Sequence, residues 1–490
     1  MKGVIKMKKI IGIILALVIA FSSVLPAFAQ ADHNPETCTD VPVLIVRGMD
    51  FGGLYTDVGT DAQEAAIRAN AKDIIISAFK GIIGSMLNLS LDPFVESAAE
   101  IAGGIFEYIK MNPDGTSKHN TGAIQYPLAA ENYDDFLNGV DSEYGMIRAM
   151  IEEIGDHAYY FNYDWRIDPL VVADEINATV ERMVAETGHD KINIACCSMG
   201  GIMTLAYLTE YGYDRVNRVC FMSSTFCGAQ VCSDLLAGQL EIGADTLYNI
   251  ADDGTKDIPV VNVLMKVLKY TGVFKAASLI GNKITNEYVD MVNELVLVPV
   301  FGCNLTFWTL LQPEDRQGAI DFIMGGKPEN YPELYTKIQA LWAMIDGRNA
   351  LLDEMLKNGV QIAVVAHYDS PLIPVFEGAG MNGDGILETY QMSGYATVAP
   401  YGETLGDDYV AANPEYLSPD RVVDLSTAIL PEYTYIIKGA PHVAGSYGTE
   451  YSDFFVWLMT YDGEDFYAGV NPDYPRFMLS GDEQTLAKFE

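Results

Sequence analysis

Short apolar runs alternate along this chain with longer segments in which apolar positions recur every three or four residues. Continuous apolar runs are typical of strands buried on both faces of a sheet, and the second pattern predicts amphipathic helices. We expect strands near residues 43–46, 158–163, 192–196, 217–222, 361–366 and 433–437, and helices near residues 144–153, 170–186, 200–211 and 450–459. This alternation predicts an α/β fold with a mostly parallel central sheet and helices on both of its faces.

Two apolar stretches do not fit this alternation. Residues 60–130 interrupt the first crossover, residues 233–357 separate the fourth and fifth of the expected strands, and most apolar positions in both stretches have helical spacing. Extra core helices would explain them. The alternative that we favour is a lid-like insertion at about 60–130 and a helical cap over 233–357, which would exclude water from a site and gate it. The core would then consist of residues 30–232 and 358–490.

The beginning of the chain has the order of a secretory signal peptide. A basic stretch, Met1–Lys9, precedes an apolar run, Ile10–Leu25, which closes with Ala27-Phe28-Ala29. We expect cleavage near Ala29 and a secreted, extracellular protein. The alternative is an uncleaved membrane anchor. The short apolar run and the small residues at its end argue against this alternative. No other uninterrupted apolar stretch has the length that a bilayer requires.

The net negative charge of the chain argues against some classes of binding partner. A formal net charge of −37 over 490 residues repels nucleic acid and anionic membranes at long range, which argues against a protein that follows a phosphate backbone. The acidic excess fits solubility outside the cell. No loop has the residue spacing of a dedicated calcium-binding loop. We therefore assign neither a metal nor a cofactor from the sequence.

Seven cysteines are too few and too unevenly spaced for a disulfide scaffold. Cys220 falls in an expected buried strand, where cysteine acts as a small apolar residue. Cys227 and Cys232 are close enough in sequence to close a small loop in an oxidising compartment. The alternative is that both remain thiols.

A serine stands at the end of the apolar strand near 192–196. Ser198 is followed by Met199, Gly200 and Gly201 and then by an apolar helix, so the layout is strand, sharp turn with serine, helix. This is the layout of a nucleophile elbow, in which small residues are needed two positions before and after the serine because strand and helix nearly touch. Gly200 meets this need, and Cys196 is small but stands where glycine is usual. The alternative is a turn whose serine is only structural.

A nucleophilic serine needs a base later in the chain. The order along the chain in this fold is serine, then an acid, then histidine, and two of the six histidines follow Ser198. His442 lies on the loop between the last expected core strand and a terminal amphipathic helix, where this fold carries its base. His367 instead ends the strand near 361–366. We expect His442 to be the base, with His367 as the alternative.

The acid that orients the base has two candidates. Asp384 lies in Asn382-Gly383-Asp384-Gly385, and Asp369 directly follows His367 and Tyr368. Both come after the strand near 361–366 and before His442. An aspartate beside glycine is also an ordinary turn signal, so each has a structural alternative.

An oxyanion hole needs two backbone N–H donors. One is expected from Met199, directly after the nucleophile. The other is expected from the loop after the first strand, where Gly48 permits close approach of the backbone. In that loop we expect Met49 to be the donor, with Asp50 as the second choice.

Together these motifs resemble the lecithin:cholesterol acyltransferase family of the α/β-hydrolase superfamily, with its related phospholipases and phospholipid:diacylglycerol acyltransferases. The resemblance covers residues 41–228 and 361–460 and is carried by Tyr163-Asp164-Trp165-Arg166 one helix before Ser198-Met199-Gly200-Gly201, by Val43 to Gly48, by Gly383-Asp384-Gly385, and by Met222 to Gly228 in place of a Gly-Ala-Pro-Trp-Gly-Gly-like turn. Secreted bacterial lipases are similar too. Cys196 and Cys197, which replace the usual glycine and histidine, depart from the family. The resemblance implies an α/β-hydrolase fold and favours Asp384 as the acid.

The resulting hypothesis is a secreted serine hydrolase that cleaves acyl esters of lipids, as a lipase or phospholipase does. Ser198, Asp384 and His442 would form its triad. The apolar cap is the reason to prefer a lipid, since a small ester needs less cover, and it implies transient contact with a lipid interface. The alternatives are a lipid O-acyltransferase, an esterase that acts on a non-lipid ester, and a non-catalytic member of the fold that uses the pocket for binding. We expect Asp164 and Arg166 to anchor structure rather than to touch substrate.

Overall fold

The structure is a computed structural model. The residues that it describes are 38, 40–50, 53–68, 101, 103–124, 145–239, 241, 243–245, 248, 269–270, 272, 274–275, 278–279, 282, 289–372, 381–442, 444, 450–463, 465–481 and 485–489. The expected signal peptide, residues 1–29, lies outside them. The chain divides after Thr39, and the whole description below concerns the unit Asp40–Glu490. Among the helices in the described ranges, none is both long and apolar enough to cross a lipid bilayer.

A central sheet of eight strands is formed by the described residues, in the order β15-β14-β13-β8-β7-β6-β1-β5. All neighbours are parallel except β14 and β15. The strands are β1 (Val43–Val46), β5 (Ala158–Phe161), β6 (Ile192–Cys197), β7 (Val216–Met222), β8 (Gln361–Tyr368), β13 (Thr434–Lys438), β14 (Phe477–Ser480) and β15 (Leu486–Lys488). The prediction of an α/β fold with a mostly parallel sheet is confirmed.

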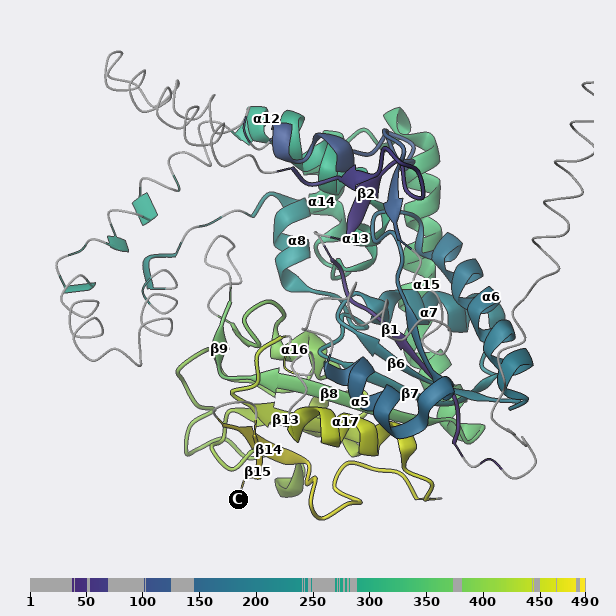
Figure 1. Cartoon of the computed structure of the whole chain (residues 1–490). Helices are drawn as coiled ribbons and strands as arrows, with labels where there is room; N and C mark the ends of the chain where they lie inside the picture. The colour runs from purple at the N-terminus through teal and green to yellow at the C-terminus, as the bar shows by residue number, and fades with distance from the viewer. Residues whose placement is uncertain are drawn as a thin grey trace, which may run out of the picture. The chain divides into compact units, whose positions relative to one another are not determined.

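Helices cover both faces of this sheet (Figure 1). On one face lie α5 (Gly145–Ile154) and α17 (Glu450–Thr460), and on the other lie α6 (Pro169–Thr187), α7 (Gly200–Tyr211) and α15 (Pro332–Lys357). The side chains of β1 alternate between the two layers: Val43 and Ile45 pack with α5 and α17, and Leu44 and Val46 pack with α6 and α7. This is the period of two that a strand buried on both faces must have.

The order of the strands reverses at β1, which has β5 on one side and β6 on the other. In the register, Val46 at the end of β1 is level with Phe161 in β5 and with Cys196 in β6. In open α/β sheets, ligands bind in the crevice at the carboxyl ends of the strands where the order reverses. The loop after β1 and the turn after β6 therefore meet at such a crevice.

The described part of residues 60–130 is helical at residues 101 and 103–105 and in the short turn η1 (Glu107–Ile109), and it contains strands as well. These strands, β3 (Glu64–Ala65) and β4 (Thr121–Ala123), form a small antiparallel sheet with β2 (Leu54–Thr56), in the order β3-β2-β4. The helical spacing was read mainly from residues 74–109, most of which lie outside the described residues. The flanking strands are too short to show a period of their own.

The expected cap, residues 233–357, is helical where it is described. It contains most of α8 (Gln230–Ala237), followed by α12 (Val289–Val292), the π-helical segment η3 (Asn293–Gly302), α13 (Leu305–Thr309), α14 (Arg316–Met324), η4 (Pro328–Asn330) and α15. Helix α15 packs on α7 and leads directly into β8. It therefore forms the crossover between β7 and β8 as well as the end of the expected cap.

Candidate active site

Ser198 occupies a strained turn between β6 and α7. Its φ is +50°, a value that is uncommon for any residue except glycine and costs about 1–3 kcal/mol. Three backbone hydrogen bonds hold the turn: the Ser198 N–H donates to the Met222 carbonyl at 3.2 Å, and the Ser198 carbonyl accepts from Gly201 at 3.1 Å and from Thr225 at 3.0 Å. This strand–turn–helix geometry is that of a nucleophile elbow.

Two glycines allow the close approach of neighbouring backbones at this turn. A Cβ on Gly200 would lie 2.5 Å from the Val46 carbonyl oxygen and 2.6 Å from that of Arg47, so α7 starts in contact with the end of β1. A Cβ on Gly48 would lie only 2.6 Å from the Cβ of Ser198. The loop after β1 therefore touches the serine side chain directly, and only glycine fits there.

Asp384 and His442 form a hydrogen-bonded pair on the loops that follow β8 and β13. The Nδ1 of His442 lies 2.7 Å from the Asp384 Oδ2, with the carboxylate fully buried and the imidazole 12% exposed. The His442 backbone N–H also donates to the Asp384 carbonyl at 3.0 Å. The other carboxylate oxygen accepts from the N–H groups of Ile386 and Leu387 at 3.0 and 2.8 Å. Both the position and the ionised form of the carboxylate are thereby fixed.

The pair shifts both pKa values in the direction that favours its ionised form. Burial acts to raise the pKa of Asp384, but the charge and hydrogen bond of His442 hold it below its ordinary value. Burial acts to lower the pKa of His442, and the Asp384 carboxylate more than offsets this, so the pKa of His442 is raised. The site is therefore suited to stabilise an imidazolium that forms during a reaction.

The alternative acid, Asp369, lies elsewhere. Its side chain is 41% exposed and its carboxylate is 3.6 Å from Lys438 Nζ, within an ion-pair network that includes Asp420. Its backbone has a φ of +77°. The structure thus brings Asp384, and not Asp369, next to His442.

The alternative base, His367, is enclosed in the core. Its Nδ1 is 3.0 Å from Ser223 Oγ and its Nε2 is 2.5 Å from Tyr451 Oη, and the residue is 1% exposed. Burial lowers the pKa of His367 to about 4. Both ring nitrogens are thus in hydrogen bonds to buried hydroxyls, and the lowered pKa favours the neutral imidazole.

The loop after β1 carries Met49. Side chains from the segment that follows β5 hold this loop by hydrogen bonds. Tyr163 Oη donates to the Arg47 carbonyl at 3.0 Å, and Trp165 Nε1 donates to the Asp50 carbonyl at 3.0 Å. The side chains of Arg47 and Asp50 form an ion pair of 2.6 Å across the same loop. Met49 therefore lies between two anchored carbonyls and directly after Gly48, the residue that contacts Ser198.

Met199, the other expected oxyanion donor, is the residue that precedes the first turn of α7. It is 3% exposed and has helical backbone angles. An N–H group at the N-terminus of a helix points toward the region where an oxyanion would form. The role of Met199 as a donor stays a prediction.

Sequence reasoning did not assign Tyr163 and Trp165 a role. The sequence did carry a signal for such a role. Each of these aromatic side chains has one polar group, and that group needs a hydrogen-bond partner when the ring is buried. Asp164 and Arg166 pair with each other at 2.6 and 2.9 Å, and Arg166 also donates to the Thr121 carbonyl in β4 at 2.9 Å. These two side chains anchor structure, as expected.

The loop after β7, residues 223–228, supports the elbow from the other neighbouring strand. Besides the Thr225 N–H, the hydroxyls of Ser224 and Thr225 donate to the Ser198 carbonyl at 3.3 and 3.2 Å. Ser223 has a φ of +42°. Cys227 and Cys232, at the end of this region, are buried and are not joined in a disulfide.

Comparisons with known proteins add little to this geometry. No family model matches the chain, and no curated protein matches it. One solved structure found as similar is described as the crystal structure of the Tle4-Tli4 complex; the match covers 87% of this chain and 99% of that chain, at 10% sequence identity and a TM-score of 0.40. A likeness of this strength supports no conclusion about activity.

Proposed function

We propose that this chain is a serine hydrolase that cleaves carboxylic esters, and that its substrates are lipids. The observation that carries the proposal is the buried Asp384 carboxylate, 2.7 Å from the Nδ1 of His442, at the same edge of the sheet as the elbow of Ser198. An acid paired with Nδ1 leaves the Nε2 of His442 as the nitrogen that takes up a proton.

Each group has one role in the proposed reaction. Ser198 Oγ attacks the ester carbonyl carbon while His442 accepts its proton, and Asp384 stabilises the imidazolium. The N–H groups of Met199 and Met49 hold the oxyanion of the tetrahedral intermediate. The C–O bond then breaks, and the alcohol leaves with the proton from His442. Water, activated by His442, attacks the acyl-enzyme, releases the carboxylic acid and restores Ser198.

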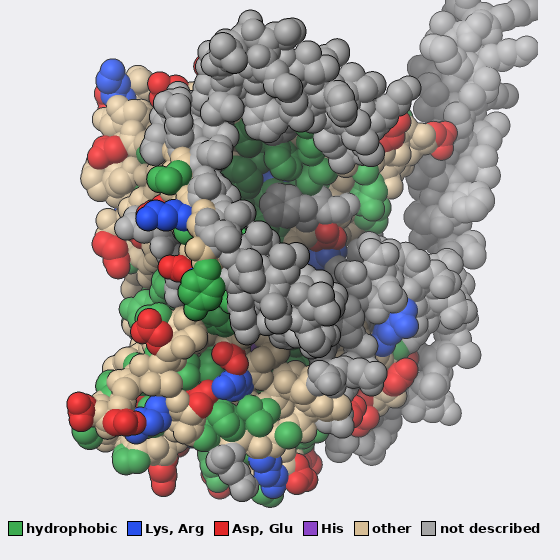
Figure 2. Space-filling view, turned by 90° about the vertical axis from the view of Figure 1, so that its left-hand side faces the viewer, with side chains coloured by type: hydrophobic (Ala, Val, Ile, Leu, Met, Phe, Trp, Pro, Cys, Tyr) green, Lys and Arg blue, Asp and Glu red, His purple; other side chains and the backbone are tan. Residues whose placement is uncertain are grey.

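A lipid substrate is favoured by exposed apolar side chains among the described residues between α8 and α12. Tyr270 and Leu279 in this region are 92% and 64% exposed. Figure 2 shows hydrophobic side chains close together in the upper half of one face of the molecule. Apolar side chains that gather on a surface are typical of sites that receive an apolar ligand or contact a lipid interface.

Export through the signal sequence at residues 1–29 belongs to the same proposal. A mature protein that begins at Gln30 and is recovered outside the producing cell would support it. A cell-retained protein with an intact N-terminus would count against it.

The test of the proposed function is hydrolysis of p-nitrophenyl esters from short to long acyl chains, combined with labelling by a fluorophosphonate. Wild-type protein is expected to react with the probe and to favour long chains, and Ser198→Ala is expected to lose both activities. Ser452→Ala is a matched control, because Ser452 is buried and its hydroxyl has no hydrogen-bond partner among the described residues. Labelling that persists in Ser198→Ala would show that the nucleophile is another residue.

A further inference from the structure

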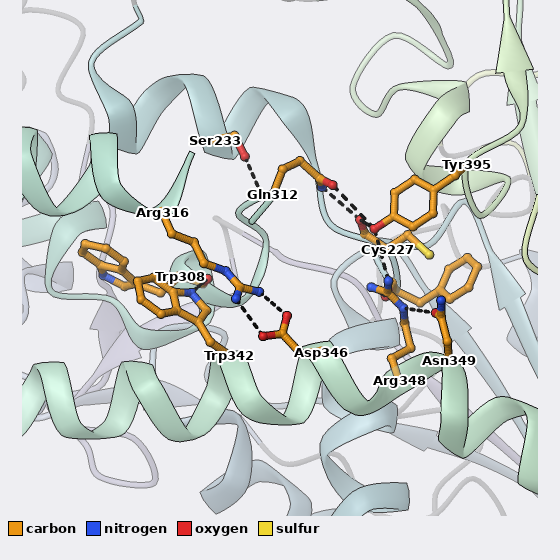
Figure 3. Close-up of polar contacts among 11 residues, drawn as sticks. Cys227, Ser233, Trp308, Gln312, Arg316, Trp342, Asp346, Arg348, Asn349 and Tyr395 are labelled. Atoms are coloured by element: carbon orange, nitrogen blue, oxygen red, sulfur yellow. Dashed lines mark hydrogen bonds and ion pairs between the residues drawn. The ribbon is translucent and has the colours of Figure 1, made fainter. Parts of the chain in front are cut away.

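A cavity of about 160 Å³ lies between α15 and the loop after β7, outside the Ser198 site. Its walls include Cys227 and Gly228 from that loop, Gln312 from the segment after α13, Ile345 and Arg348 from α15, and Tyr395. Figure 3 shows Arg348 rising from α15 toward Cys227 and Tyr395. None of Ser198, Asp384 and His442 lines this cavity.

The guanidinium of Arg348 is buried without a carboxylate bound to it. Arg348 is 8% exposed, and its hydrogen bonds go to the Asn349 side-chain oxygen at 3.2 Å, the Phe226 carbonyl at 3.1 Å and the Tyr395 hydroxyl at 3.1 Å. All three acceptors are neutral, and in the described residues they use three of the five N–H donors of a guanidinium. The charge of Asp346, which also lines the cavity, acts on Arg348 without a hydrogen bond to it among the described contacts, so the buried guanidinium is only partly balanced.

The carboxylate that does line the cavity is already paired. Asp346 accepts two hydrogen bonds from Arg316, at 2.6 and 2.9 Å (Figure 3). These bonds to Arg316, and the charge of Arg348, hold the pKa of Asp346 below its ordinary value. One carboxylate thus faces two guanidinium groups, which leaves one positive charge in excess beside the cavity of a chain whose net charge is −37.

The polar residues that line the cavity are held in place by several contacts. Tyr395 has a φ of +73°, and its hydroxyl also donates to the Cys227 carbonyl at 3.2 Å. The Gln312 side chain donates to the same carbonyl at 3.0 Å. A Cβ on Gly228 would lie 2.4 Å from Gln312 Nε2, so this approach requires glycine. Strained backbone that is held by several contacts is typical of ligand sites.

Part of the lining is apolar and the space is small. The apolar lining residues are Leu311, Pro313 and Ile345, the last of which lies one turn before Arg348 in α15. A volume of about 160 Å³ corresponds to roughly five water molecules at about 30 Å³ each. This suits a compound of a few heavy atoms with one charged and one hydrocarbon end, rather than a lipid.

We propose that this cavity binds a small organic carboxylate, with its two oxygens on Arg348 and its hydrocarbon part against Leu311 and Ile345. The planar guanidinium presents two parallel N–H groups that match a carboxylate. The Tyr395 hydroxyl, 3.1 Å from Arg348, lies at the same end of the cavity. The proposal is independent of the reaction at Ser198.

The test is calorimetric titration of the whole protein with sodium butyrate at constant ionic strength, with butyramide and inorganic phosphate as comparison ligands. Wild-type protein is expected to bind one butyrate, and to bind butyramide and phosphate at least tenfold more weakly. Asn349→Asp places a carboxylate where Arg348 now meets an amide oxygen at 3.2 Å, and is expected to weaken butyrate binding at least tenfold. Arg348→Gln is expected to do the same.

Gln339→Glu is the matched control, since it adds the same charge to an exposed position of α15 away from the cavity. Its affinity for butyrate is expected to stay within twofold of wild type. Because Asn349 is exposed, its replacement leaves the core of α15 intact even if Arg348→Gln fails to fold. Absence of saturable butyrate binding, equal binding by Asn349→Asp, equal binding of butyramide, or tighter binding of phosphate would each overturn the proposal.

Discussion

His442 is bound to Asp384 twice, through its imidazole Nδ1 at 2.7 Å and through its backbone N–H, which donates to the Asp384 carbonyl at 3.0 Å. The second bond joins the two loops irrespective of the side chains. A change of the Asp384 carboxylate therefore alters the charge on the imidazole without releasing the loop that carries it, which makes this position suitable for a test of the proposed mechanism.

Asp384→Asn is expected to lower kcat by about 10⁴-fold while the protein stays folded, because an amide neither fixes the tautomer of His442 nor stabilises the imidazolium. Asp369→Asn is the comparison, and its kcat is expected to stay within about threefold of wild type. Steady-state ester hydrolysis and circular dichroism measure the two effects. An equal loss in both variants would mean that Asp384 has no special role.

The pH profile of ester hydrolysis is expected to follow His442. Because the neutral imidazole is the form that accepts a proton, kcat/KM rises with pH through the pKa of His442, which Asp384 raises above its ordinary value of 6.5. In Asp384→Asn the raising charge is gone and burial remains, so the acidic limb is expected to move to lower pH. A limb that stays in place would contradict the assignment of His442 as the base.

Gly48→Ala is expected to lower kcat/KM by about 10²-fold, because its methyl group would lie 2.6 Å from the Ser198 Cβ and displace the nucleophile. Overpacking at this site is expected to cost about 1–3 kcal/mol in the free energy of unfolding. Gly347→Ala, in α15 with open space around the added carbon, is the control and is expected to be neutral or stabilising. Urea denaturation and kinetics on both variants check this prediction.

Glu388 is expected to make stability depend on pH. Its buried carboxylate accepts from the N–H groups of Gln230 and Val231 at the start of α8, at 2.9 and 3.0 Å. Burial raises its pKa from 4.5 to about 7. Since the pKa in the folded state is the higher one, this contribution to stability is fully present below pH 4.5 and is lost as the pH rises through about 7.

Glu388→Gln removes that titration and keeps an acceptor for α8. Relative to wild type it is expected to gain on the order of 3 kcal/mol in the free energy of unfolding between pH 4.5 and pH 8. Glu329→Gln, at an exposed position, is expected to show no such trend. The urea midpoints of wild type, Glu388→Gln and Glu329→Gln across this pH range test the prediction. A difference in midpoint between wild type and Glu388→Gln that does not change with pH would refute it.

Tyr451→Phe separates the buried histidine from the proposed base. It leaves His367 Nε2 without its partner at 2.5 Å, and the unsatisfied nitrogen is expected to cost about 1–3 kcal/mol of stability. Hydrolysis at a temperature where the variant is folded is expected to stay within about threefold of wild type, since the hydrogen bond between His442 and Asp384 is retained. A loss of activity comparable to that of Asp384→Asn would assign His367 a direct role.

The central strands of the buried sheet were predictable from the sequence. The short strands at the edge of that sheet and in the small sheet were not. Strands such as β1 and β8 appear as continuous apolar runs because both of their faces are covered. In β14 only Phe477, Met478 and Leu479 are apolar, too short a run to indicate a strand, and β2, β3 and β4 are shorter still. Such strands depend on the backbone that they pair with, which lies far away in the sequence.

The candidate site was only partly predictable for a similar reason. The order of Ser198, Asp384 and His442 along the chain indicated their possible roles, which remain predictions. Which of Asp384 and Asp369 meets His442 depends on how the loops after β8 and β13 lie in space, and no local pattern encodes that. The contacts of Tyr163 and Trp165 with the loop after β1 are likewise tertiary.

The parallel pairing of β7 with β8 has a consequence for how such a protein diversifies. The chain leaves the sheet after β7 and returns to it at the neighbouring strand, so everything between α8 and α15 is inserted at a single place in the core. Ser198 precedes that insertion, and Asp384 and His442 follow it. An exchange of the inserted segment as a unit would therefore leave the strands that precede these three residues, and their order along the chain, unchanged.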